Sequence, residues 1–100
     1  EHLLAGPFHP ALHQLVDSAI FCDMAEYLLR NNPDGSQPVF ISHPKDLSAL
    51  KGQRNENILR LKNRFKLSDI FIFSSKDVGR GGLVLQTRGG EVLIDRNSLD

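Results

Sequence analysis

Apolar residues return every three or four positions between residues 10 and 30, the spacing that places side chains on one face of an α-helix. Pro10 suits the first turn of such a helix, where its missing N–H is not needed. The series ends in NNPDGSQP, which has the composition of a loop. The pattern predicts a helix over residues 10–30 as the main scaffold, with Leu12, Leu15, Val16, Ala19, Ile20, Met24 and Leu28 on its apolar face.

Short apolar runs predict the strands. Residues 39–41 form one run between two prolines, and residues 70–73 form another that is β-branched and aromatic. Residues 83–87 and 91–95 flank Arg88-Gly89-Gly90, a connection of hairpin length with glycine available for positive φ. We therefore predict four strands, the last two joined as a hairpin.

Two helices are predicted between the first two strands. Pro44 begins the first, and Gly52 is expected to end it. Asn55 is a credible N-cap for the second. In that second helix Ile58, Leu61 and Phe65 recur at the spacing of a core-facing side.

This order of elements predicts an α+β fold: a long N-terminal helix, then β-α-α-β-β-β with a mainly antiparallel sheet covered by helices on one face. One hundred residues fit a single domain, made of the scaffold helix 10–30, a β-α-α-β unit over 38–74 and a β-hairpin over 82–95. The chain has no initiator Met and no signal-like start, so we expect an accessory domain excised from a longer protein. No apolar run approaches the roughly 20 residues that span a bilayer, and a cytoplasmic location is favoured.

Charge is distributed in blocks although the net charge is zero. Residues 45–66 carry seven Lys/Arg and two acidic residues, whereas residues 1–36 carry five acidic residues and one Arg. A basic turn and helix of this kind is one way to hold a phosphate backbone. A basic helical face that only keeps a domain soluble is the more common alternative.

The unit over residues 38–74 resembles the core of a KH domain, in which a Gly-rich turn between two helices clamps the nucleic-acid backbone. The turn here is Lys51-Gly52-Gln53-Arg54-Asn55. It has one glycine where the KH module has a pair, since Asn55 holds the last place, and Asn tolerates left-handed backbone better than most residues. The alternative is an ordinary joint between two helices with a glycine C-cap.

Other candidate sites are weaker. His9 and His13 stand four residues apart, but no carboxylate or cysteine completes a metal set, and His2 and His43 are isolated, so surface or capping histidines are the simpler interpretation. Cys22 is the only cysteine and is expected to be a buried or half-buried thiol rather than a nucleophile. No acid–base or nucleophile set is visible, so we predict no catalytic and no metal-binding residues in this domain.

Two segments are similar to bacterial, clostridial-type radical S-adenosylmethionine proteins related to the catalytic subunit of Elongator, some of them labelled oxygen-independent coproporphyrinogen III oxidase-like. FHPALHQLVDSAIF, residues 8–21, resembles the segment after the catalytic core of that family. HPKDLSALKGQRNENILRLKNRF, residues 43–65, is similar to the family's tail. The family pattern maps onto Pro44, Asp46, Ser48, Gly52, Gln53, Arg54, Asn57 and Ile58 without a gap.

This resemblance implies an accessory C-terminal domain of a radical S-adenosylmethionine enzyme. The family binds a four-iron, four-sulfur cluster through a CxxxCxxC motif, which this chain lacks. The cluster and S-adenosylmethionine are therefore expected in the missing part of the parent protein. The final segment, GGLVLQTRGGEVLID, is instead loosely similar to the terminal hairpin of peripheral-stalk proteins that regulate rotary and secretion ATPases.

Two functions follow from these patterns. In the first, the domain binds RNA, plausibly tRNA: Lys51, Gly52, Gln53 and Arg54 contact backbone phosphate, while Arg60, Lys62 and Arg64 add electrostatic attraction. In the second, it is a protein-interaction module that docks on the catalytic core of its own chain or on a partner such as an ATPase, without nucleic acid or membrane. The second function predicts an exposed apolar patch on the long helix, formed by Ile20, Phe21, Met24, Leu28 and Leu29.

Overall fold

The computed structural model describes residues 10–33 and 37–98, except for the side chains of residues 10–14 and 98. Within these ranges, α1 (Pro10–Asn31) precedes β1 (Val39–Ser42), α2 (Leu47–Lys51), α3 (Glu56–Phe65), β2 (Phe71–Ser74), β3 (Gly82–Thr87) and β4 (Gly90–Asp95). Short 3-10 turns lie at Pro44–Asp46, Gln53–Asn55 and Arg96–Ser98. The predicted order of elements and the predicted scaffold helix are confirmed.

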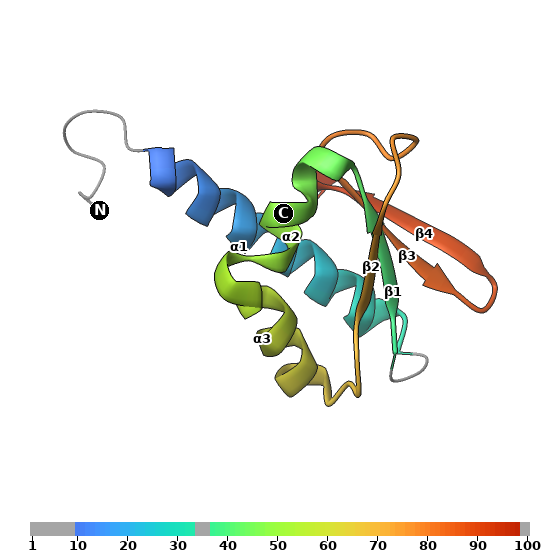
Figure 1. Ribbon diagram of the computed structural model, residues 1–100. Coiled ribbons are helices and arrows are strands. Elements are labelled where there is room, and N and C mark those ends of the chain that lie inside the picture. The colour runs from blue at the N-terminus through green and yellow to red at the C-terminus, as the bar shows by residue number, and fades with distance from the viewer. Residues whose placement is uncertain (1–9, 34–36, 99–100) are drawn as a thin grey trace.

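The four strands form one sheet in the order β2-β1-β3-β4, and the three helices lie on one face of it (Figure 1). β1 pairs with β2 in parallel, whereas β1–β3 and β3–β4 are antiparallel. Parallel neighbours need a crossover connection, which α2 and α3 supply. The α+β fold with a mainly antiparallel sheet and a central β-α-α-β unit is therefore confirmed.

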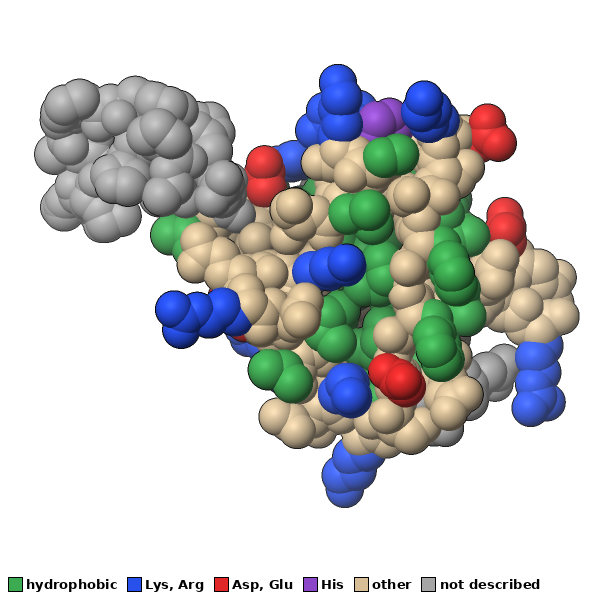
Figure 2. Space-filling model, in the orientation of Figure 1, with side chains coloured by type: hydrophobic (Ala, Val, Ile, Leu, Met, Phe, Trp, Pro, Cys, Tyr) green, Lys and Arg blue, Asp and Glu red, His purple; other side chains and the backbone are tan. Residues whose placement is uncertain are grey.

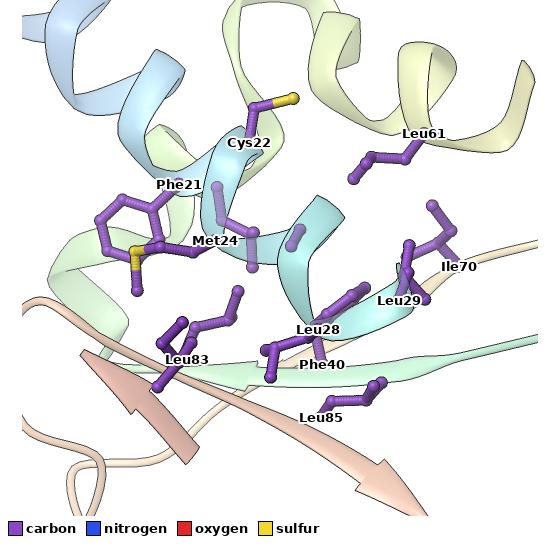
Figure 3. Close-up of a cluster of buried hydrophobic side chains, with 13 residues drawn as sticks. Phe21, Cys22, Met24, Leu28, Leu29, Phe40, Leu61, Ile70, Leu83 and Leu85 are labelled. Atoms are coloured by element: carbon purple, nitrogen blue, oxygen red, sulfur yellow. The ribbon is translucent and has the colours of Figure 1, made fainter. Parts of the chain in front are cut away.

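α1 packs its apolar face across the sheet and forms the centre of the core (Figure 3). Phe21, Met24 and Leu28 meet Phe40 of β1 and Leu83 of β3, and all five side chains are almost fully buried. Burying an apolar side chain of this size contributes about 1.5–3 kcal/mol, so each of these five contacts stabilises the fold substantially.

The prediction of an exposed apolar patch on α1 is wrong, because the residues of that patch belong to this core. Phe21, Met24, Leu28 and Leu29 are buried, and Ile20 is partly buried against them. α1 has apolar residues on more than one face because it contacts the sheet on one side and both shorter helices on the other. Three residues predicted on the apolar face, Leu15, Val16 and Ala19, are instead exposed, as is Tyr27.

No described helix covers the opposite face of the sheet (Figure 1). The strand register places Phe73, Ile41, Val84 and Leu93 in one row across all four strands. Phe73 is 56% exposed and Leu93 65% exposed at the two edges of the sheet, and Phe71 lies beside Phe73 along β2 at 41%, whereas Ile41 is partly buried and Val84 is buried between them. This set, called the far face below, is a second apolar surface of the domain.

Candidate nucleic-acid interface

The turn between α2 and α3 has an unusual backbone. Gly52, at φ 77° and ψ 172°, ends α2, and its N–H donates to the Ser48 carbonyl over 2.9 Å. Arg54 and Asn55 then adopt left-handed conformations, with φ of 54° and 60°. α2 ends at Gly52 as predicted, and Asn55 has the left-handed backbone that asparagine tolerates. Asn55 occupies the N-cap position of α3, but its side chain makes no capping hydrogen bond, because left-handed backbone turns it away from the helix start.

Gly52 has a structural reason for being glycine. Its positive φ is strained for any residue with a Cβ. A Cβ built there would also lie 3.0 Å from Cγ and 3.1 Å from the backbone N of Asn57. The glycine therefore lets the turn close against Asn57, whatever the turn binds.

Asn57 holds the three helices together, a role that the sequence analysis missed. Its side chain is buried, and Nδ2 donates to the carbonyls of Ser18 in α1 (3.0 Å) and of Ala49 (3.1 Å) and Leu50 (3.2 Å) in α2. The last carbonyls of a helix have no partner inside it, so Asn57 satisfies groups that α2 itself leaves free. The available signal was a polar residue at a core-facing position of α3.

The predicted side chains of the turn are accessible. Lys51, Gln53 and Arg54 are exposed, and Gly52 is half-buried. The turn borders a shallow pocket of about 390 Å³ between α1 and α2, whose lining includes Lys45, Gly52 and Gln53 as well as Asp17, Ser18, Ser48 and Ala49. Cationic and amide groups thus reach solvent around the start of α3, as the phosphate-binding interpretation requires.

Arg60 and Arg64 are directed toward α1 and share one carboxylate. Glu26 Oε2 lies 3.9 Å from Arg60 Nε, and Glu26 Oε1 lies 3.7 Å from Arg64 Nε and 3.5 Å from Arg30 Nη2. Glu26 and these three arginines are called the Glu26 cluster. The arginines stay more than half exposed, so each ion pair contributes little to stability. Glu26 nevertheless cancels part of their charge, which the sequence pattern did not indicate.

Lys62 is separated from both arginines. At about 100° per residue it lies roughly 160° around α3 from Arg60 and from Arg64. All three also lie along the helix from the turn, since six to ten residues at about 1.5 Å each place them roughly 9–15 Å beyond Arg54. The seven predicted residues therefore form three groups: the turn, the Glu26 cluster, and Lys62 on the other flank.

A second buried polar contact fixes the start of α2. Asp46 is buried, and its Oδ1 accepts from Arg80 Nε over 3.0 Å, while Oδ2 accepts from the N–H of Gly81 over 2.8 Å. Sequence analysis included Asp46 only in a family pattern and left Arg80 unassigned. The contact ties the glycine-rich loop between β2 and β3 to the helix pair that carries the turn.

Two of the remaining predictions, a capping histidine and a buried thiol, agree with the structure. His43 is a capping residue, since its Nδ1 accepts from the N–H of Lys45 over 3.1 Å. Cys22 is a buried free thiol. Among the described residues no group of three metal-ligating side chains occurs, and the side chains of His2, His9 and His13 lie outside the description. In the same described ranges, no helix is long and apolar enough to cross a membrane.

Cys22 gives a testable pH dependence. Burial, followed by the nearby Glu26 carboxylate, raises the pKa of its thiol above the ordinary value of 9.0. The folded state then binds the thiol proton more tightly than the unfolded state. The protonated thiol therefore makes its full contribution to the free energy of unfolding below pH 9, and this contribution is lost as the pH rises further. We expect the free energy of unfolding in urea to fall more steeply above pH 9 in the wild type than in Cys22→Ala. Parallel pH profiles for the two proteins would contradict this.

No protein-family model, curated protein or solved structure matches this chain. Its function is therefore inferred from its own residues and their arrangement.

Proposed function

We propose that this chain is a non-catalytic accessory domain that binds the sugar–phosphate backbone of RNA, such as tRNA, through the turn at residues 51–55. The observation that carries this proposal is the left-handed backbone of Arg54 in an exposed turn. For a residue with a Cβ that conformation costs about 1–2 kcal/mol relative to right-handed backbone. Strained, exposed residues of this kind are concentrated at binding sites. A guanidinium held there by the backbone is directed to solvent.

The charges around the turn suit a phosphodiester. Lys51 and Arg54 are exposed beside the N-terminal end of α3, and Lys45 lies across the adjoining pocket. The N-terminal end of a helix carries a partial positive charge and free N–H groups, which favour anions. Lys62 contributes long-range attraction. The Glu26 cluster contributes less than its three arginines suggest, because Glu26 offsets part of their charge.

The longer protein that this proposal implies is a radical S-adenosylmethionine enzyme. Support for it is the resemblance of residues 8–21 and 43–65 to that family. The domain would then present RNA to the catalytic core of its own chain, which would bind the four-iron, four-sulfur cluster and S-adenosylmethionine. Cys22 is the single cysteine of this chain and is buried, so the three cysteines of the cluster motif are not among these residues.

The test is an NMR titration of the 100-residue chain with bulk tRNA at low and moderate salt. We expect shifts clustered at residues 45–57 that weaken as salt rises. Changing both Lys51 and Arg54 to Ala should lower the dependence of log K on log salt by about two, roughly one for each phosphate that is no longer neutralised. Arg88→Ala is the matched control, since Arg88 is an exposed arginine in the β3–β4 turn. Equal binding by the double variant and the control would refute the proposal.

Arg54→Gly separates binding from folding. Glycine adopts left-handed backbone without strain, so this change should stabilise the domain by about 0.5–1 kcal/mol in urea unfolding. The same change should weaken tRNA binding, because the cation is removed. Increased stability with unchanged affinity would show that the strained arginine has no part in binding RNA.

The far face favours a second function, docking on the catalytic core of a longer protein. No described helix covers that side of the sheet (Figure 1), and Phe71, Phe73 and Leu93 are exposed on it. Exposed apolar side chains that form a patch commonly mark an interaction site. The far face thus takes the place of the α1 patch as the proposed docking surface. Absence of tRNA shifts at low salt, together with reduced binding of the far-face variant Leu93→Asp to that core, would favour docking over RNA binding.

A further inference from the structure

The two edge strands of the sheet differ in how they are protected from other strands. β4, at one edge, carries Glu91 and Asp95 and is flanked by Arg88 and Arg96. β2, at the other edge, reads Phe-Ile-Phe-Ser and contains no charge, proline or glycine, although Asp69 and Lys76 lie two residues beyond its ends. Charged residues, prolines and bulges are the usual means by which an edge strand avoids pairing with another chain. Within its four residues, β2 has none of them.

The outer edge of β2 offers backbone groups for hydrogen bonding. The N–H of Phe71 donates to the Pro38 carbonyl over 3.0 Å, and the N–H of Ser75 donates to the Ser42 carbonyl over 2.9 Å. Backbone groups alternate in direction along a strand, so Phe71, Phe73 and Ser75 are directed toward β1. The N–H and C=O groups of Ile72 and Ser74 therefore face away from the sheet. No strand in the described part of the chain pairs with that edge.

Apolar side chains accompany this open edge. Figure 2 shows hydrophobic side chains gathered over β2 and between it and the helices. Phe71 and Phe73 project on the far face, 41% and 56% exposed, and Ile72 packs on the helix side. A strand added here would gain backbone hydrogen bonds as well as contact with aromatic rings, the combination used in recognition by strand addition.

We infer that the outer edge of β2 pairs with β2 of a second copy of this chain, antiparallel and about a two-fold axis. In this register Phe73 lies opposite Phe73 of the second copy, and Ile72 lies opposite Ser74 of the second copy. All four outward backbone groups are then paired in each copy. Side chains directed to the far face meet side chains directed the same way, so the apolar surface becomes continuous across both sheets.

A second copy is a suitable partner because β2 itself has the properties that a strand pairing with this edge needs. The occupant must be extended and uncharged, with spare backbone groups and aromatic side chains on one side, and β2 has all of these. The apolar area available for burial limits the strength of pairing. A whole phenylalanine side chain has roughly 200 Å² of surface, so Phe71 and Phe73, at 41% and 56% exposed, together expose about 200 Å² in each copy. A standard interface buries about 800 Å² per partner. The dimer is therefore weak, with a dissociation constant on the order of 0.1–1 mM.

The test is self-association of the 100-residue chain, followed by sedimentation equilibrium and by amide NMR shifts from about 20 μM to 1 mM. We expect a monomer–dimer equilibrium with concentration-dependent shifts centred on residues 71–75. Phe73→Lys places two ammonium groups opposite each other at the axis and should raise the dissociation constant at least about tenfold. Leu93→Lys, the matched change at the other edge, should leave it unchanged.

Ser74→Pro tests the backbone contribution separately. It removes an outward N–H, whereas the bonds to β1 are made by Phe71, Phe73 and Ser75, so the chain should fold and remain monomeric. A wild-type chain that is monomeric at 1 mM would overturn the inference, as would association disrupted equally by Leu93→Lys and Phe73→Lys. Shifts on α1 rather than β2 would instead assign self-association to the exposed Leu15 and Val16, and the β2 interface would be rejected.

Discussion

Asn57→Ala is expected to lower the free energy of unfolding by about 2–4 kcal/mol, although it removes only a small polar side chain. The deleted amide donates to three carbonyls, on Ser18, Ala49 and Leu50. Leaving a buried polar group without a partner costs about 1–3 kcal/mol, and the vacated space adds to this. Urea unfolding followed by circular dichroism measures the loss.

Asn63→Ala provides the control for Asn57→Ala. Asn63 is in the same helix but exposed, so its replacement should change the free energy of unfolding by less than about 0.5 kcal/mol. Equal effects of the two alanine variants would mean that the Asn57 amide does not join the helices.

A double-mutant cycle with Gly52→Ala tests the contact between the turn and Asn57. The added Cβ would approach Asn57 Cγ to 3.0 Å, so part of the cost of Gly52→Ala depends on the Asn57 side chain. The double variant should therefore lose less stability than the two single losses together, by at least about 0.5 kcal/mol. The positive φ at Gly52 is strained in both backgrounds and cancels in this comparison.

The elements of the fold were predictable because their signals are local. Apolar spacing identified α1 and α3, and Pro44 and Gly52 bounded the helical segment between them. The strand predicted over residues 70–73 is displaced by one residue from β2, and the hairpin strands begin one residue earlier than expected. End residues of this kind depend on pairing partners, here β1 for β2 and β3 for β4. A run of apolar residues does not reveal them.

The candidate site was predictable only where its geometry is local. The positive φ of Gly52 and Asn55 could be anticipated, because Gly and Asn tolerate that backbone, whereas the left-handed Arg54 could not. The grouping of Arg60, Lys62 and Arg64 as one attractive surface did not anticipate Glu26, because α1 is more than thirty residues earlier in the chain. The contact between Asn57 and Ser18 spans 39 residues, and no short-range pattern predicts it.

The error about α1 has a similar origin. Periodicity shows that a helix has an apolar face, but not how many neighbours it meets. α1 contacts α2, α3 and the sheet. The residues of the predicted patch are therefore buried against these elements and are not available to a partner. Phe71, Phe73 and Leu93 are exposed on the far face, because strand alternation directs every second side chain away from the helices.

Asp46→Ala is expected to lower the free energy of unfolding by about 2–3 kcal/mol. The buried N–H of Gly81 would lose its acceptor, and hydrogen bonds to a charged group contribute about 1.5–3 kcal/mol. The Arg80 side chain is largely exposed, so its ion pair with Asp46 adds only a little. Hydrogen exchange should show the amide of Gly81 losing its protection before the amides of β3 lose theirs.

Two further substitutions separate the charge of Asp46 from its position. Asp77→Ala removes an exposed carboxylate from the same loop and should change the free energy of unfolding by less than about 0.5 kcal/mol. Asp46→Asn retains an oxygen that can accept from Gly81 but loses the charge, so its cost should fall between those of the two alanine variants. If Asp46→Ala frees the loop while tRNA still shifts residues 51–55, the turn binds independently of the sheet. If those shifts disappear as well, the contact of Asp46 with Gly81 and Arg80 holds the turn in its binding conformation.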